Sequence, residues 1–270
     1  MAGLHKREFN VTGPSIPGKR GRFMRPANQG MDEILVTSAQ MKELDRRAIE
    51  EHGMPSLVLM ERAALAAVEV LRDEGFDLSR TVCFCGPGNN GGDGIAVARL
   101  LHLAGHDAVV CFVGDPGKRS VETRRQQEIA ESYGVRFIIF GEASSTPTMA
   151  TTPTMATTAT PTMAATPTMA ATEPPTTVVD AVFGIGGGRA PAGGYLEAIR
   201  IINAARGAGA RVLALDIPSG VSADTGEAAG EAVQADVTVT FAYMKTGLTR
   251  PPGSALSGMV IVKGIGIYED

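Results

Sequence analysis

Short apolar runs that alternate with helical patterns constrain the fold of this chain more than any other feature. The runs lie at 81–85, 108–114, 135–140, 176–184, 211–220, 235–242 and 258–266. The run at 108–114 is apolar throughout, as expected for a strand buried on both faces. Strands that alternate with helices predict a parallel sheet with helices on both faces. We therefore predict an α/β fold, with one doubly wound domain over 31–270.

The segments between the runs carry helix signals. Thr37 with Gln40 three residues later has the form of a capping box, so a helix is expected to begin there. A second helix is expected from Ser56 to about Glu74, because apolar residues recur there at helical spacing. Three more helices are expected over 95–103, 121–133 and 195–206.

Two regions fall outside this alternation. Residues 1–30 are polar and lack periodicity, so we expect a flexible N-terminal tail. Residues 144–175 contain four copies of Pro-Thr-Met-Ala, and proline at this density fits neither a packed helix nor a central strand. We expect a disordered insertion there, on a surface loop of the domain.

The composition argues against several classes of protein. The net charge of −4 lacks the basic excess typical of proteins that bind nucleic acid. No apolar run approaches the roughly 20 residues of a membrane span, and no apolar stretch follows the basic residues of the tail as in a secretory signal. Three cysteines form no even disulfide framework, which favours a reducing compartment. We expect a cytoplasmic protein that binds neither nucleic acid nor membrane.

Polar residues follow three of the apolar runs. They are the stretch Asn89–Asp93, Asp180 with the loop 184–190, and Asp216 with Ser219. In open parallel sheets, ligands bind beyond the carboxyl ends of the strands. The three segments are therefore expected to meet at one edge of the sheet and form a binding site.

The first of these segments lies in the loop "CGPGNNGGDG" (85–94), which opens a predicted helix. A helix N-terminus suits phosphate, and glycines let the backbone approach a ligand. No Lys-Ser/Thr follows, so this is not a Walker loop. The spacing also matches G-x-G-x-x-G, but Asp115 fits the expected ribose-binding acid poorly, which argues against a dinucleotide-dependent dehydrogenase. A plain tight turn, with Asp93 favoured by the helix dipole, is the structural alternative.

The two later acids have alternative interpretations as well. Asp180 stands in an apolar strand, where a carboxylate is costly unless it is hydrogen-bonded, paired or bound to a cation. Asp216 precedes Pro218 in a rigid turn, which suits either catalysis at a cleft or an Asx-type turn. Carboxylate, amide and hydroxyl oxygens together also suit a hard cation.

Six segments carry a resemblance to a known family. They are "TSAQMKELDRRAIE" (37–50), "LVLMERAA" (57–64), "CGPGNNGGDGIAVARLL" (85–101), "VVDAVFGIG" (178–186), "ALDIPSGVSADTG" (214–226) and "ADVTVTFAYMKTGL" (235–248). In this order they resemble the YjeF N-terminal domain family, the NAD(P)H-hydrate epimerases. The resemblance implies a Rossmann-like three-layer αβα sandwich with a mostly parallel central sheet, often as a homodimer.

The resemblance also implies the reaction and the site. The reaction interconverts the R and S forms of hydrated NADH or NADPH, and a separate dehydratase consumes the S form. Potassium is the implied cofactor, at Asn90, Asp180 and Ser219. The implied substrate-binding residues are Asn89, Asn90, Gly91, Gly92, Asp93, Gly184, Ile185, Gly186, Gly187, Gly188, Arg189, Ala190 and Asp216, and we expect Asp216 to be the catalytic acid/base. A non-catalytic nucleotide-binding or scaffold module of the same fold is the alternative.

Overall fold

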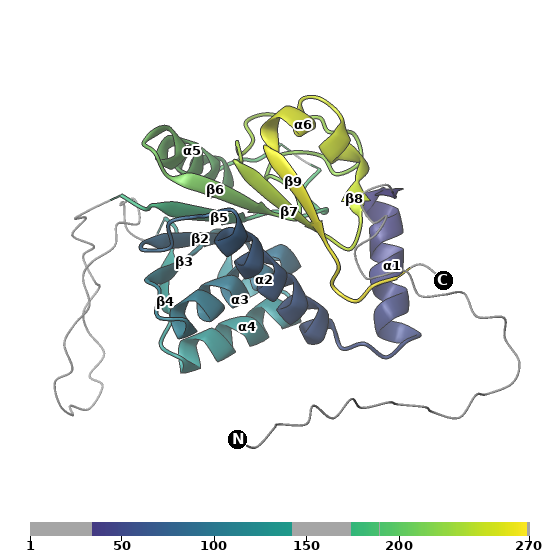
Figure 1. Cartoon of the computed structure of the whole chain (residues 1–270), viewed down its shortest axis with the longest axis horizontal. Helices are drawn as coiled ribbons and strands as arrows, with labels where there is room; N and C mark the ends of the chain where they lie inside the picture. Colours follow the sequence, from purple (N-terminus) through teal and green to yellow (C-terminus); the bar gives the residue numbers. More distant parts are fainter. Residues whose placement is uncertain (1–33, 142–173, 189, 269–270) are drawn as a thin grey trace, which may run out of the picture.

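A seven-stranded parallel sheet forms the centre of the protein (Figure 1). The structure is a computed structural model that describes residues 34–141, 174–188 and 190–268. Across the sheet the strands are β4 (Arg136–Ile139), β3 (Ala108–Phe112), β2 (Thr81–Cys85), β5 (Thr177–Ala181), β6 (Arg211–Leu215), β7 (Val237–Phe241) and β9 (Met259–Lys263). Every pairing is parallel. The predicted α/β fold is confirmed.

Helices cover both faces of this sheet (Figure 1). One face carries α2 (Ser56–Asp73), α3 (Asn89–Leu103) and α4 (Val121–Ser132), and the other carries α5 (Gly194–Gly207). Successive strand residues point to opposite faces. In β2, Cys83 therefore packs with α2 and α3, whereas Phe84 packs with α5. The sheet is apolar on both faces because it is the middle of three layers.

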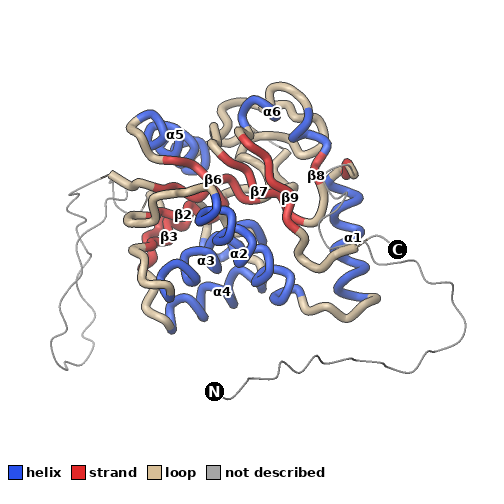
Figure 2. The backbone as a smooth tube through the Cα atoms, viewed as in Figure 1, coloured by secondary structure: helices blue, strands red, loops and turns tan. Residues whose placement is uncertain are grey.

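The remaining elements lie beside the sheet. They are β1 (Leu35–Val36), α1 (Ser38–Glu50), the 3₁₀ turns at Pro116–Lys118 and Thr246–Thr249, β8 (Met244–Lys245) and α6 (Gly253–Leu256). The predicted capping box of α1 is present, with Thr37 and Gln40 each bonding the other's backbone. β1 pairs with β8, and α1 stands apart from the other helices next to them (Figure 2).

Helix α1 is tied to the rest of the chain by polar and apolar contacts. The backbone N and Oγ of Ser38 donate to the carboxylate of Asp224 at 2.6 and 2.7 Å. Met41, Leu44 and Ala48 bury the inner side of the helix. These contacts fix one side of α1 against the body of the protein.

Helix α3 begins at Asn89, earlier than the start at residue 95 that the sequence pattern predicts. The glycines were interpreted as loop residues, but Gly91, Gly92 and Gly94 lie inside the helix. A Cβ at Gly94 would overlap the side chain of Ala181 and lie 2.8 Å from Cys85 Sγ. Glycine is therefore needed here because α3 packs directly on β2 and β5.

Two other kinds of prediction can be compared with the structure: the bounds of the strands, and the segments expected to lie outside the folded domain. Several strands are shorter than predicted, as in β9, which spans Met259–Lys263 within the predicted 258–266, whereas β2 has the predicted bounds 81–85. The tail expected over 1–30, and all but the last two residues of the insertion expected over 144–175, lie outside the described residues. Among the helices of the described ranges, none combines the length and the apolar character that a bilayer crossing requires.

The packing of α3 gives a first prediction. Replacing Gly94 by alanine should lower the free energy of unfolding by about 1–3 kcal/mol, because the new methyl group overpacks the contact with β5. Gly207→Ala is the matched control, since Gly207 also lies in a helix but is exposed and has no atom within 4 Å of its Cβ position. It should be neutral or stabilise by up to about 1 kcal/mol. Urea denaturation measures both, and equal effects would contradict the packing role.

Candidate active site

The strand order reverses direction next to β2, and this creates a crevice. From β2 the chain moves outward to β3 and β4, then returns to β5 on the other side of β2. In doubly wound sheets the ligand site lies at this switch point, beyond the carboxyl ends of the two strands. Here the two loops press together, because a Cβ on Gly86 after β2 would overlap the carbonyl oxygen of Val182 after β5.

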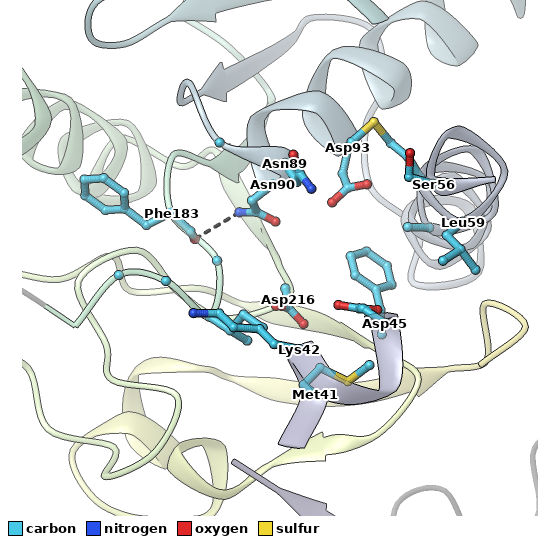
Figure 3. Close-up of a pocket in the computed structure, with 18 of the residues that line it drawn as sticks. Met41, Lys42, Asp45, Ser56, Leu59, Asn89, Asn90, Asp93, Phe183 and Asp216 are labelled. Atoms are coloured by element: carbon cyan, nitrogen blue, oxygen red, sulfur yellow. Dashed lines mark hydrogen bonds between the residues drawn. The ribbon is translucent and has the colours of Figure 1, made fainter. Parts of the chain in front are cut away.

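A cavity of about 470 Å³ lies at this edge of the sheet (Figure 3). Its size falls within the range of small-molecule sites. Its polar lining residues are Lys42, Asp45, Ser56, Asn89, Asn90, Asp93, Asp216 and Lys245. Its apolar side chains are Met41, Ile49, Leu59, Met60, Ala63, Pro87, Val182, Phe183, Ile185, Phe241 and Ile265. The cavity thus combines an apolar wall for a ring with charged groups that can move protons.

Asp216 is held in an unusual conformation by a buried ion pair. Its φ is 66°, a left-handed value that costs free energy for a residue other than glycine and often marks a functional site. Its Oδ1 lies 2.6 Å from the Lys245 ammonium and accepts a hydrogen bond from Thr240 at 3.3 Å. Lys245, only 1% exposed, also donates to the carbonyl of Phe241 at 2.6 Å. Lys245 and Asp216 therefore form an ion pair at the wall of the cavity.

Two more carboxyl groups share this cavity. Asp93 points into it from α3, and Asp45 reaches it from α1 (Figure 3). Burial, reinforced by Asp216 and Asp45 and opposed by Lys245, raises the pKa of Asp93 well above its usual value. Burial also raises the pKa of Asp45 to about 6, which Lys245 counteracts and Asp216 reinforces. The helix-dipole interpretation of Asp93 fails, since no acid lies in the first turn of α3.

Asp180 and Ser219 form a hydrogen-bonded group that contacts Phe183, a residue of the cavity wall. The Asp180 carboxylate is fully buried and accepts from Ser219 N at 2.8 Å, Ser219 Oγ at 2.6 Å and Val182 N at 3.3 Å. Burial outweighs these bonds and raises the pKa of Asp180 to about 6. The Ser219 hydroxyl in turn accepts from Phe183 N at 2.9 Å. These bonds connect the end of β5 to the turn after β6.

Asn90 joins this group from α3. Its Nδ2 donates to the carbonyl of Phe183 at 2.9 Å (Figure 3), while its buried Oδ1 has no hydrogen-bond partner within the described ranges. A buried acceptor without a partner is costly and calls for an explanation, such as an ion or a water. Asn90 and Ser219 thus both bond to the backbone of Phe183, and Asp180 is connected to it through Ser219.

Not all of the predicted substrate-binding residues line the cavity. Those that line the cavity are Asn89, Asn90, Asp93, Gly184, Ile185, Gly186, Gly187 and Asp216. Gly91 and Gly92 instead face backbone or side chains inside the protein, and Gly188 and Ala190 are exposed beyond the cavity. Arg189 lies outside the described residues.

Sequence reasoning missed Asp45 and Lys245. Asp45 follows Met41 by four residues and adjoins Leu44, so a charged side chain stands beside the apolar side of an amphipathic helix. Lys245 stands in "FAYMKTG", directly after a buried strand. A charge in an apolar pattern is the signal that would have identified both residues.

Fold and cavity together define a doubly wound α/β protein with a ligand-sized, acid-lined site at its switch point. Residues 56–247 match the family described as YjeF-related protein N-terminus, so the chain belongs to that family. An NAD(P)H-hydrate epimerase of Weissella koreensis (strain KACC 15510) is 41% identical over 234 residues, covering 87% of this chain and 92% of the relative. An NAD(P)H-hydrate epimerase of Limosilactobacillus reuteri (strain ATCC 55730 / SD2112) is 41% identical over 233 residues, covering 86% and 95%.

One solved structure supports the fold. The crystal structure of yeast ynu0, YNL200c, has a TM-score of 0.63 with 19% sequence identity, covering 86% of this chain and 88% of the yeast chain. At this identity the likeness concerns the arrangement of strands and helices alone.

The buried ion pair gives a second prediction. Lys245→Met should lower the free energy of unfolding by about 3–5 kcal/mol at neutral pH, because it leaves the Asp216 carboxylate buried without its cation. Lys263→Met is the control, since Lys263 pairs with the exposed Glu69 at 2.8 Å and should cost at most about 1 kcal/mol. Adding Asp216→Asn to Lys245→Met should recover much of the loss. Urea denaturation checks this, and additive effects of the two substitutions would contradict the pairing.

Proposed function

We propose that this protein is an NAD(P)H-hydrate epimerase, which interconverts the R and S forms of hydrated NADH and NADPH. The main support is a switch-point cavity lined by three carboxyl groups, in a chain 41% identical to proteins of that name over most of both lengths. A purely non-catalytic module would have no use for buried acids of this kind, because they destabilise the fold.

Epimerisation requires only that the protein transfers protons and holds the nicotinamide ring in place. In the hydrate, C6 of the nicotinamide ring carries the hydroxyl and is bonded to N1. Departure of the hydroxyl as water, assisted by the N1 lone pair, leaves a planar cationic ring. Water that returns on the other face inverts the centre. The protein must protonate the leaving hydroxyl and accept a proton from the returning water.

Asp216 is the proposed catalytic residue. Its carboxylate is held by Lys245, lies at the end of β6 and lines the cavity. An ionised carboxylate there can take the proton of the returning water and can stabilise the positive ring by its charge. The strained backbone of Asp216 fits a residue whose position is set by function.

Two loops are proposed to hold the diphosphate and the ring. The free N–H groups at the N-terminus of α3, beginning at Asn89, favour a phosphate group. Across the crevice, the cavity-lining residues Gly184, Ile185, Gly186 and Gly187 are proposed to contact the substrate. Gly188, Arg189 and Ala190 complete the predicted substrate-binding residues of this loop, as Gly91 and Gly92 do for the segment 89–93. The apolar side chains of Leu59, Met60 and Phe241 then contact the ring.

Potassium is proposed as the bound cation. The donor set fits it: the Oδ1 of Asn90 lacks a partner, and the neighbouring oxygens belong to the Asp180 carboxylate, the Ser219 hydroxyl and the Phe183 carbonyl. Hard cations prefer such oxygen ligands. When bound, the ion would supply positive charge near the diphosphate. Asn90, Asp180 and Ser219 would hold it at the junction of three elements.

The proposed reaction also implies partners. A separate NAD(P)H-hydrate dehydratase that accepts the S form would consume the product, and we propose a homodimer in the cytoplasm as the working form. The substrate is the hydrate of either NADH or NADPH.

The function and the role of Asp216 are tested together. Purified protein given the R hydrate should produce the S hydrate, followed by chromatography. Asp216→Asn should lower kcat at least about 100-fold, because a neutral amide cannot accept the proton. Asp107→Asn, in a surface pair with Arg136, should keep the wild-type rate. An Asp216→Asn protein that folds and epimerises at the wild-type rate would refute the assignment. A wild type that binds the hydrate without converting it would favour a binding module.

The cation site makes a separate prediction. Replacing KCl by choline chloride should raise KM several-fold while the melting temperature changes little, because the ion contacts the loops that hold the substrate. Rate measurements across a KCl titration, with melting curves in the same buffers, check this. A large fall in melting temperature with unchanged KM would show instead that the ion serves the fold.

A further inference from the structure

Asp45 is a cavity carboxyl group that comes from outside the sheet. It lies on α1, beside the buried residues Met41, Leu44 and Ala48, and its side chain reaches the cavity (Figure 3). Helix α1 precedes the segment 56–247 that matches the family. Asp216 enters from the end of β6, so the two carboxyl groups belong to two different walls.

The proposed reaction needs two kinds of proton transfer. One group must give a proton to the departing hydroxyl, and one must take a proton from the returning water. Asp216 is suited to take a proton, since its Oδ1 lies 2.6 Å from the Lys245 ammonium. In this ion pair Asp216 starts as the anion that faces the buried ammonium, so the proton for the departing hydroxyl must come from another group. A second carboxyl group is therefore required as the acid.

We propose that Asp45 is a second catalytic residue, the general acid that acts from the α1 wall of the cavity while Asp216 acts from the strand ends. This inference rests on the proposed epimerase function. In one direction, Asp45 gives its proton to the hydroxyl on C6, the C6–O bond breaks and water leaves. Water then bonds to C6 on the other face and gives a proton to Asp216. The reverse direction retraces these steps: Asp216 returns the proton that it accepted, and Asp45 takes one back. After each turnover, proton exchange of both carboxyl groups with solvent restores the starting state.

The surroundings of Asp45 favour this role. The ionisable groups that share the cavity with it are Lys42 from α1, Asp93 from α3, Asp216 after β6 and Lys245 from β8. The described lining residues of α2 and β7, and of the segment after β9, are uncharged. Burial raises the pKa of Asp45 to about 6, and Asp216 adds to this while Lys245 opposes it. A carboxyl group with such a pKa can exchange its proton near neutral pH.

Asp93 is less able than Asp45 to exchange a proton near neutral pH. Burial and its two acidic neighbours raise its pKa well above the usual value. A group that keeps its proton can donate a hydrogen bond to the substrate, but it exchanges the proton less readily. Asp45 is therefore the better general acid of the two.

The test compares wild type, Asp45→Asn and Asp73→Asn in the assay for R-to-S conversion. Asp73 is the exposed last residue of α2 and serves as the matched control. Asp45→Asn should lower kcat about 100-fold and change KM less than about threefold, because the amide keeps the shape but has no acidic proton. Asp73→Asn should behave as wild type.

The pH profile separates this role from a structural one. A general acid must be protonated, so wild-type kcat/KM should fall as pH rises through about 6, following the Asp45 pKa. Asp45→Asn should lose that fall. Its melting temperature at pH 7.5 should equal or exceed that of wild type. The reason is that the folded pKa of Asp45 lies above the unfolded value, so the ionised carboxylate destabilises the fold above pH 6.

Different results would contradict the role of Asp45 and the proposed epimerase function. An active wild type with no fall of kcat/KM through about pH 6 overturns the role of Asp45, whether or not the variant folds. A folded Asp45→Asn protein with wild-type kcat and pH profile also overturns it and leaves the epimerase function intact. A wild type that converts neither hydrate overturns the proposed function itself, and the acid role with it.

Discussion

The site depends on how closely α3 approaches the sheet. Glycine at position 94 removes the side chain that would hold the helix away from β5, and Gly86 does the same between the loops after β2 and β5. The first turn of α3 therefore reaches the switch point, where Asn90 can bond to the Phe183 carbonyl. Without this approach the crevice would be wider, and the three segments that supply the polar groups would not meet.

Charge is the second constraint on this region. Three carboxyl groups, Asp45, Asp93 and Asp216, share the cavity with the buried ammonium of Lys245, which pairs with only one of them. Desolvation and mutual repulsion leave the other two with raised pKa values. These buried carboxyl groups lower the stability of the fold locally, but they place groups that can exchange protons beside an apolar wall. Active sites commonly combine lower stability with such groups.

The sequence predicted the fold and about half of the site. The parallel sheet followed from the alternation of apolar runs with helical patterns. The convergence of the segments that contain Asn90, Asp180 and Ser219 followed from the rule that ligands bind beyond the carboxyl ends of parallel strands, because the strand ends can be located in the sequence. Lys245 and Asp45 were missed because their roles come from contacts with residues distant in sequence, which periodicity does not report. The glycines of α3 were misplaced for the same reason, since Gly94 is required by its contact with Ala181 rather than by a turn.

Helix α1 lies outside the central sheet, but the cavity is incomplete without it. The strand pair β1–β8 and the bonds from Ser38 to Asp224 hold the helix against the rest of the chain. A fragment starting at residue 56 would keep every strand of the central sheet, yet it would lack one wall of the cavity and one of its acids. The smallest unit with the fold and the smallest unit with the complete site are therefore different lengths of chain.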